Sequence, residues 1–281
     1  MPDNAKRNAV LCPRCRKLVS ADEIKCPYCQ LARPGHAGWR AARPWNLQQP
    51  DYLIRTIIGI NIALYVVSLL LDPGRMGYSP DPLRFLSPSN RSMLLLGASG
   101  TLPVLQFGRW WTLLSANYLH GSLLHILFNM LAFRQLARLT VREFGPERTM
   151  VIYTLGGVIG FGVSVLGGVR FTIGASAAVC SLIGAALYFG KARGGVYGQT
   201  VFRQVGGWAV GLMLFGLLPG INNWGHGGGM AAGFLLAWAL GYLEKKRTAP
   251  VHRILAAVCT AVTLLVLAWA VGSSVFVRLR A

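Results

Sequence analysis

The sequence is poor in charged residues, and above all in acidic ones. Only 13% of its 281 residues are charged, 53% are hydrophobic, and Asp and Glu together number nine. Soluble domains carry roughly 25% charged residues. Backbone groups inside a bilayer must be paired within the chain, which helices achieve by themselves. The composition therefore predicts an all-α polytopic membrane protein.

Long apolar runs are missing from the first 45 residues, so we expect no cleavable signal peptide. Seven apolar stretches follow, and a helix needs about 20 residues to cross a bilayer. They cover residues 54–71, 112–138, 149–168, 172–190, 204–218, 226–243 and 253–272, of which the fourth and fifth are short. The connection 72–111 is rich in Pro and Gly but holds apolar runs, which predicts a loop partly embedded in the interface.

The excess of basic residues has two readings. A net charge of +19 is compatible with nucleic-acid binding. The basic residues cluster, however, in alternate connections between the apolar stretches, as the positive-inside rule describes for membrane proteins. This distribution argues against nucleic acid. It predicts a multi-pass protein of a bacterial-type plasma membrane, with the N-terminus cytoplasmic and the C-terminus outside, although Arg278 and Arg280 are a modest counter-signal.

Four cysteines stand in the polar N-terminal module, residues 1–32. Cys12 and Cys15 form one C-x-x-C pair, and Cys26 and Cys29 form a second. Two such pairs suit tetrahedral zinc held by four thiolates, although their separation is shorter than usual. Redox dithiols or two disulfides are the alternatives, and a cytoplasmic location disfavours disulfides. We expect a small zinc ribbon whose closed site is structural.

A proline-containing linker, residues 33–52, follows the predicted ribbon. Its position suggests that the ribbon is a docking or regulatory module with a cytoplasmic partner. The basic residues of the module could touch lipid headgroups, but the simpler interpretation is that they form a solvent-exposed face. The other two cysteines, Cys180 and Cys259, lie in apolar stretches and are expected to be packing residues.

One serine and one histidine carry the chemistry that the sequence predicts. Ser176 follows Gly174-Ala175, and His226 opens a later apolar stretch rich in small residues. A histidine beside a serine can activate it as a nucleophile. None of the nine acidic residues lies within an apolar stretch, so a buried triad is disfavoured. We therefore expect a Ser–His dyad.

Further polar residues can stabilise a developing oxyanion. The N–H of Ser176 is expected at the unpaired start of a helix. His125 and Asn129 are four residues apart and share a helix face. His120 belongs to the same apolar stretch and is expected to point partly aside. Gly229 and Gly233, which face Ala177 and Gly184, would allow the two site-bearing helices to approach closely.

The combination of these motifs resembles the rhomboid family of intramembrane serine proteases. The resemblance rests on H-x4-H-x3-N at His120, His125 and Asn129, on G-A-S at Gly174–Ser176, and on H-x2-G-x3-G at His226, Gly229 and Gly233; Trp110-Trp111 and Glu143-Phe-Gly145 also match. It implies a six-helix protease core over residues 53–245. The zinc ribbon and a seventh transmembrane helix with a C-terminal tail, residues 246–281, are additions to that core.

The resemblance also implies the activity and the roles of the residues. Membrane proteins would be cleaved near their transmembrane segments, at the outer face of the bilayer, without a catalytic cofactor. Ser176 would be the nucleophile and His226 the general base. His125 and Asn129 would stabilise the oxyanion together with the N–H of Ser176. His120, Gly174, Gly229 and Gly233 would be auxiliary.

Three positions depart from the family pattern. Ala177 and Cys180 replace the usual glycine and aromatic residue after the serine, and Thr112 replaces the usual arginine after the tryptophan pair, with Arg109 before it. None of them removes a catalytic atom. Two other readings stay open: a catalytically inactive relative that binds membrane clients, and a channel or transporter. The lack of paired intramembrane carboxylates counts against the latter.

Overall fold

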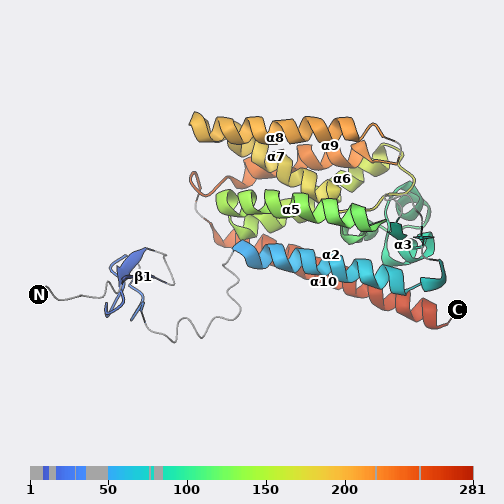
Figure 1. The fold of residues 1–281 in the computed structure, drawn as a ribbon, viewed down its shortest axis with the longest axis horizontal. Coiled ribbons are helices and arrows are strands. Elements are labelled where there is room, and N and C mark those ends of the chain that lie inside the picture. Colours follow the sequence, from blue (N-terminus) through green and yellow to red (C-terminus); the bar gives the residue numbers. More distant parts are fainter. Residues whose placement is uncertain are drawn as a thin grey trace, which may run out of the picture. The chain divides into compact units, whose positions relative to one another are not determined.

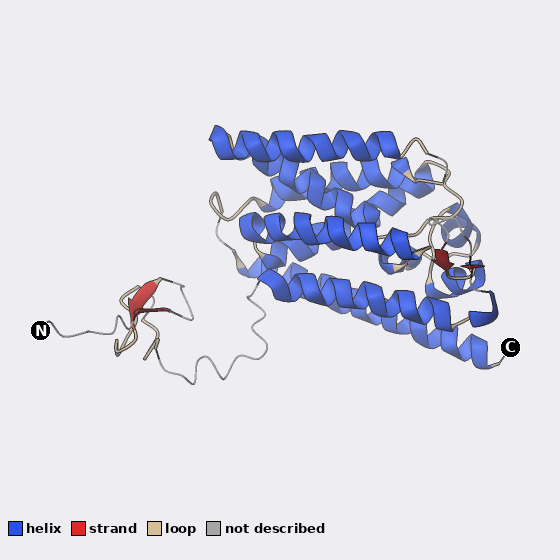
Figure 2. Ribbon diagram, viewed as in Figure 1, coloured by secondary structure: helices blue, strands red, loops and turns tan. Residues whose placement is uncertain are grey.

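The computed structural model describes residues 9–12, 17–28, 30–35, 50–75, 77–78, 85–218, 220–246 and 248–280. The chain divides into two compact units, Met1–Leu47 and Gln48–Ala281. Buried side chains form a small cluster in the first unit and larger clusters in the second. The second unit is built almost entirely of helices, whereas the described part of the first contains short strands (Figure 2).

The described part of the first unit contains two paired strands and two similar backbone hydrogen bonds made by cysteines. Strands β1 (Ala9–Leu11) and β2 (Leu18–Ser20) pair antiparallel. Cys12 and Cys26 are buried beside the hairpin. The N–H of Cys12 donates to the carbonyl of Lys17 at 3.0 Å, and the N–H of Cys26 donates to the carbonyl of Leu31 at 2.8 Å. Each of the two cysteines therefore donates its N–H to the carbonyl of the residue five positions later.

Half of the predicted zinc ligands lie outside the described residues. These are Cys15 and Cys29, and most of the predicted linker 33–52 also lies outside them. Among the residues that are described, no group of three or more His, Cys, Asp or Glu side chains could hold a metal ion. The zinc ribbon therefore stays a prediction.

Long helices make up most of the second unit, and most of them run roughly along one direction (Figure 1). They are α2 (Pro50–Leu70), α5 (Leu123–Phe144), α6 (Pro146–Leu166), α7 (Ser176–Arg193), α8 (Gly195–Phe215), α9 (Asn223–Leu240) and α10 (Pro250–Leu279). Three of them, α2, α6 and α10, are long and apolar enough to cross a membrane by length and composition. The predicted seventh apolar stretch forms α10, which packs on α6.

The start of α5 corrects a predicted boundary. The apolar stretch 112–138 is not one helix, because α5 begins only at Leu123. Ser122 is extended there, with φ −165°, and its hydroxyl accepts a hydrogen bond from the N–H of His125 at 3.2 Å. A serine cap of this kind starts a helix. His120 therefore lies before the helix and not on it, contrary to the prediction.

Helix α8 is also longer than predicted. The stretch 204–218 was expected to be short, but α8 runs over 21 residues, Gly195–Phe215. At about 1.5 Å per residue, that length is close to the thickness of the hydrocarbon core. The first half of α8 carries the polar residues Gln199, Arg203 and Gln204. Because they interrupt the apolar run, the length of that run underestimates the length of the helix.

The described residues of the connection between α2 and α5 form several short elements. They include a hairpin of β3 (Gly77–Tyr78) and β4 (Phe85–Ser87), the helix α3 (Asn90–Leu96), the π-helical turn η3 (Leu102–Gln106), α4 (Thr112–Ser115) and the 3-10 turn η4 (Ala116–Tyr118). Met93 and Leu96 of α3 are buried in the protein. Leu94 and Leu95 are half-buried, and the position of this apolar run in the membrane interface stays a prediction.

Arg109 stabilises this connection by hydrogen bonds to the end of α3. Its guanidinium donates to the carbonyl oxygens of Leu94 at 2.8 Å and Leu95 at 3.3 Å, at the end of α3, and its Cζ lies 4.7 Å from the centre of the Trp111 ring. Carbonyls at a helix C-terminus lack partners within the helix, and arginine is a good donor to them. Arg109 thus supports the loop although position 112 holds threonine.

Helix α7 lies at the centre of the second unit. It packs against α5, α6, α8 and α9, and most of its residues are buried. The residues that contact its neighbours are small: Gly156 of α6 leaves space for Ser181, and Gly184 of α7 faces the backbone of Met230 in α9. Small residues of this kind allow helix backbones to approach within a membrane. The residue that begins α7 is Ser176.

Candidate active site

Ser176 and His226 meet where α7 and α9 begin. The Oγ of Ser176 lies 3.0 Å from the Nε2 of His226, a hydrogen-bond distance between residues fifty apart in sequence. His226 is buried, with 5% of its surface exposed, whereas Ser176 is partly exposed. A serine hydroxyl and an imidazole nitrogen at this distance can exchange a proton.

Two glycines of α9 permit this distance. A Cβ atom on Gly229 would collide with the carbonyl oxygen of Ala177, and a Cβ on Gly233 would collide with that of Ser181. Gly160 of α6 closes the third side, because a Cβ there would lie 2.8 Å from the carbonyl oxygen of Gly225. Three helix backbones thus touch directly behind the Ser–His pair.

His125 faces the backbone just before the serine. A Cβ atom on Gly174 would lie 2.7 Å from the Nε2 of His125 and 3.7 Å from the Oγ of Ser176. Gly174 has φ +126°, which side-chain-bearing residues rarely adopt. The backbone conformation and the lack of a side chain at Gly174 together let the imidazole of His125 approach the loop that leads into Ser176.

The hydrogen bonds of His125 define which nitrogen can donate. Its Nδ1 accepts from the N–H of Gly121 at 3.3 Å. A neutral imidazole that accepts at Nδ1 carries its proton at Nε2. Asn129, one turn along α5, donates from Nδ2 to the carbonyl oxygen of His125 at 2.9 Å. An asparagine amide has two N–H donors, so one remains for another acceptor.

His120 packs against His125 from outside the helix. The centres of the two rings lie 5.1 Å apart at 70°, an edge-to-face arrangement. His120 is fully buried, and neither of its ring nitrogens has a hydrogen-bond partner among the described residues. The structure thus brings His120 to the site through the ring of His125.

The described carboxylates lie apart from His226. Its Nδ1 has no hydrogen-bond partner within the described part of the chain. Asp72 accepts from the hydroxyl of Ser89 at 3.0 Å, and Glu143 accepts from Tyr197 at 2.8 Å. Glu244 pairs with Arg193 at 2.9 Å. Asp81, the other acidic residue of the long connection, lies outside the described residues. Within the described residues, the geometry is that of a Ser–His pair without a third, acidic member.

The departures from the family pattern are accommodated by packing. Ala177 is fully buried in a cluster with Ala116 and Phe161. Cys180 is fully buried in α7. Thr112 donates from its hydroxyl to the carbonyl oxygen of Arg109 at 2.7 Å. These side chains therefore have structural contacts of their own, and none of them fills the space between Ser176 and His226.

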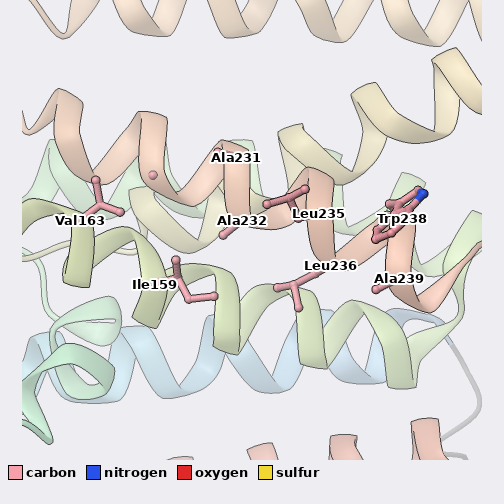
Figure 3. A pocket seen from close by; sticks show the side chains of 9 residues that line it. Ile159, Val163, Ala231, Ala232, Leu235, Leu236, Trp238 and Ala239 are labelled. Carbon is pink, nitrogen blue, oxygen red and sulfur yellow. The ribbon is translucent and has the colours of Figure 1, made fainter.

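An open groove on the flank of α6 and α9 is a different feature. Its volume is about 530 Å³, and it is lined by Ile159, Val163, Gly228, Ala231, Ala232, Leu235, Leu236, Trp238 and Ala239 (Figure 3). The lining contains no acid, base or nucleophile. Neither Ser176 nor His226 contributes to it, so this groove is not where the chemistry of the Ser–His pair takes place.

Three polar residues near the pair were not anticipated from the sequence. Asn222 accepts the N–H of Gly225 at 2.9 Å and donates to the hydroxyls of Ser164 at 2.7 Å and Thr172 at 2.9 Å. An asparagine four residues before His226 is a recognisable helix-capping signal. Ser164 and Thr172 carry no comparable signal, because hydroxyl residues are common in apolar helices and loops.

Comparisons with known proteins agree with this architecture. Residues 107–243 match the Rhomboid domain. RHOMBOID-like protein 4 of Arabidopsis thaliana is 32% identical over 212 residues, which are 67% of this chain and 52% of that protein. RHOMBOID-like protein 1 of Arabidopsis thaliana is 28% identical over 225 residues, 72% of this chain and 56% of that protein.

A bacterial relative is also similar. Rhomboid protease GluP of Bacillus subtilis (strain 168) is 31% identical over 156 residues, which are 55% of this chain and 31% of that protein. The chain spans only about half the length of the two Arabidopsis proteins. The apolar helices and the matched domain make this chain an integral membrane protein. The Rhomboid domain and the rhomboid-named relatives support its assignment to the rhomboid family.

Proposed function

We propose that this chain is an intramembrane serine endopeptidase that cleaves proteins containing transmembrane segments near the outer membrane face. The observation that carries the proposal is the 3.0 Å distance between the Oγ of Ser176 and the Nε2 of His226. The similarity to Rhomboid protease GluP supports it. No cofactor is needed, because a serine activated by a base attacks a peptide carbonyl directly.

The first step uses the Ser–His pair. The Oγ of Ser176 attacks the carbonyl carbon of the scissile peptide bond, and its proton passes to the Nε2 of His226. The carbonyl π electrons move onto the oxygen, which becomes an oxyanion. Collapse of this intermediate expels the amine, which takes the proton from His226, and leaves an acyl group on Ser176. Water then repeats the sequence and releases the acid.

The oxyanion is held by donors on two helices. The N–H of Ser176 is in the first turn of α7, where N–H groups have no partner within the helix. The Nε2–H of His125 faces the same loop, and the spare N–H of Asn129 comes from the next turn of α5. Fixed donors aimed at developing charge are among the largest contributions to such catalysis.

The proposed topology places the pair near the outer face. Basic residues such as Lys191 and Arg193 lie in the last turn of α7, at the opposite end from Ser176. Cytoplasmic helix ends carry such an excess of basic residues. The long helices of the second unit would all cross a bacterial-type plasma membrane, with the N-terminus cytoplasmic and the C-terminus outside. Water can then reach the acyl group from the outer side.

The first unit is proposed to be a zinc ribbon. Cys12 and Cys26 would hold the ion together with Cys15 and Cys29, and the matching backbone hydrogen bonds of Cys12 and Cys26 support this. The ion would be structural, because four thiolates leave no open position. The unit would bind a cytoplasmic partner rather than take part in peptide hydrolysis.

Cleavage of a model single-pass substrate by the purified protein in proteoliposomes tests the proposed function. We expect two fragments from the parent protein and none from Ser176→Ala. Equal cleavage by Ser176→Ala would overturn the proposal. Absence of cleavage by the parent, together with binding of the intact substrate, would favour an inactive, client-binding relative.

A further inference from the structure

The loops before α7 and α9 determine where the proposed nucleophile and base lie. Ser176 is the first residue of α7, and His226 lies in the first turn of α9. The position of each side chain is therefore set by the start of its helix and not by the middle of the helix. A group that bridges the two helix starts would control the distance between them.

Asn222 is such a group. It caps α9, because its Oδ1 accepts from the N–H of Gly225 at 2.9 Å, while its own carbonyl accepts from the N–H of His226 at 3.2 Å. Its Nδ2 donates to the Oγ of Ser164 at 2.7 Å and to the Oγ1 of Thr172 at 2.9 Å. One amide thus joins the start of α9 to the end of α6 and to the segment that leads into α7.

Both acceptors are held in place by other bonds. Ser164 is fully buried, and its hydroxyl proton is donated to the carbonyl oxygen of Gly160 at 3.1 Å, which leaves its lone pairs for Asn222. Thr172 is buried and exchanges two backbone hydrogen bonds with Ser99, at 3.0 and 2.8 Å. Asn222 therefore binds to two fixed points of the scaffold.

Thr172 is four residues before Ser176, and Asn222 is four residues before His226. We infer that Asn222 is a positioning residue that holds His226 in register with Ser176 through Thr172 and Ser164. The inference rests on the proposed function and deepens it. In a catalytic triad, a carboxylate orients the histidine through a hydrogen bond to its ring. Here the Asn222 bridge orients His226 by fixing the backbone at the start of α9.

Two variants separate the bridge from the helix cap. Asn222→Ala removes both. Ser164→Ala combined with Thr172→Val removes only the bridge, because Asn222 can still cap Gly225. Ser89→Ala is the matched control, since Ser89 caps α3 by accepting the N–H of Ser92 at 3.1 Å and does not touch the pair. Loss of a cap alone lowers stability, typically by about 1 kcal/mol.

The measurement is the rate at which Ser176 reacts with a fluorophosphonate probe, per folded molecule of the full chain in detergent. We expect Asn222→Ala and the Ser164→Ala, Thr172→Val variant to react about 10- to 100-fold more slowly than the parent, since small misplacements of a reacting group cost this much. All three changes together should be no slower than Asn222→Ala. Ser89→Ala should react at the parent rate.

The outcomes are distinguishable. If the parent reacts and both bridge variants match its rate, with only a lower Tm, Asn222 is structural and the inference is wrong. If Asn222→Ala does not fold, the variant that keeps the cap decides alone. If the parent itself does not react at Ser176, the proposed function fails and this inference falls with it. A slower rate in Ser89→Ala equal to that of the bridge variants would also overturn the inference.

Discussion

The imidazole of His125 occupies the space that a side chain at position 174 would need. A Cβ on Gly174 would lie 2.7 Å from the Nε2 of His125, closer than real Cβ contacts come. The backbone of Gly174 is also left-handed, with φ +126°. This glycine thus connects the proposed nucleophile to a proposed oxyanion donor, and its replacement should affect both.

We predict that Gly174→Ala reduces peptide cleavage by about 100-fold or more, because His125 must move away from the oxyanion position. The backbone strain alone costs about 1–3 kcal/mol of stability. Gly168→Ala is the matched control: Gly168 also has a positive φ, +77°, but nothing lies within 4 Å of its Cβ position. Cleavage rates and thermal unfolding of both variants should be measured. Equal loss of activity in both would mean that strain, not the contact with His125, is responsible.

The approach of α7 and α9 gives a second prediction. Gly229→Ala places a methyl group against the carbonyl oxygen of Ala177 and forces the helices apart. We expect a loss of about 1–3 kcal/mol in unfolding free energy and a fall of at least about 10-fold in probe labelling of Ser176.

Gly227 provides the control on the same helix, because its Cβ would meet only the Cε of Met213 at 4.0 Å. Gly227→Ala should retain labelling and stability. The explanation would be wrong if the Gly229 variant labelled as fast as the Gly227 variant.

The proposed oxyanion donors, His125 and Asn129, can be tested by kinetics. His125→Ala and Asn129→Ala should each lower kcat by about 100- to 1,000-fold with little change in KM, because the donors act on charge that develops in the transition state. Asn61→Ala is a suitable comparison, since Asn61 makes the same bond, to the carbonyl of Ile57 four residues earlier at 2.8 Å, in α2. A rise in KM at constant kcat would assign His125 and Asn129 to substrate binding instead.

The proposed zinc ribbon would hold one zinc ion per chain. Cys26→Ser should lose the metal, measured by elemental analysis of the purified protein, because a structural site rarely survives loss of a thiolate. Cys259→Ser, in α10, should keep it. Peptide cleavage by the Cys26→Ser protein should persist against a minimal substrate. Full zinc content in the Cys26 variant would rule out the predicted ligand set.

The sequence predicts the helices of the second unit better than their ends. Apolar runs reveal where a helix can lie in a membrane, but caps decide where it starts. The run 112–138 continues through Ser122, where the backbone is extended and α5 has not yet begun, and so His120 was predicted to lie on the helix. The folded connection between α2 and α5 depends on contacts such as that of Arg109 with Leu94, which no local pattern predicts.

The candidate site, too, could be predicted only in part from the sequence. Ser176 and His226 can be identified as candidate site residues from the sequence, because polar side chains in apolar stretches are few. The distance between Ser176 and His226 cannot be predicted from the sequence, since it depends on glycines of three helices that pack without side chains between them. The Asn222 bridge was missed because its partners, Ser164 and Thr172, are ordinary residues until the fold brings them together.

The most direct test of the account is active-site labelling with a fluorophosphonate probe, followed by mass spectrometry of the labelled peptide. The parent protein should carry the label on Ser176, and Ser176→Ala and His226→Ala should each lose it while remaining folded. Ser273→Ala, a serine of α10 that donates to the carbonyl of Ala270, should label like the parent. Labelling of Ser176→Ala or His226→Ala at the parent rate would contradict a Ser–His dyad.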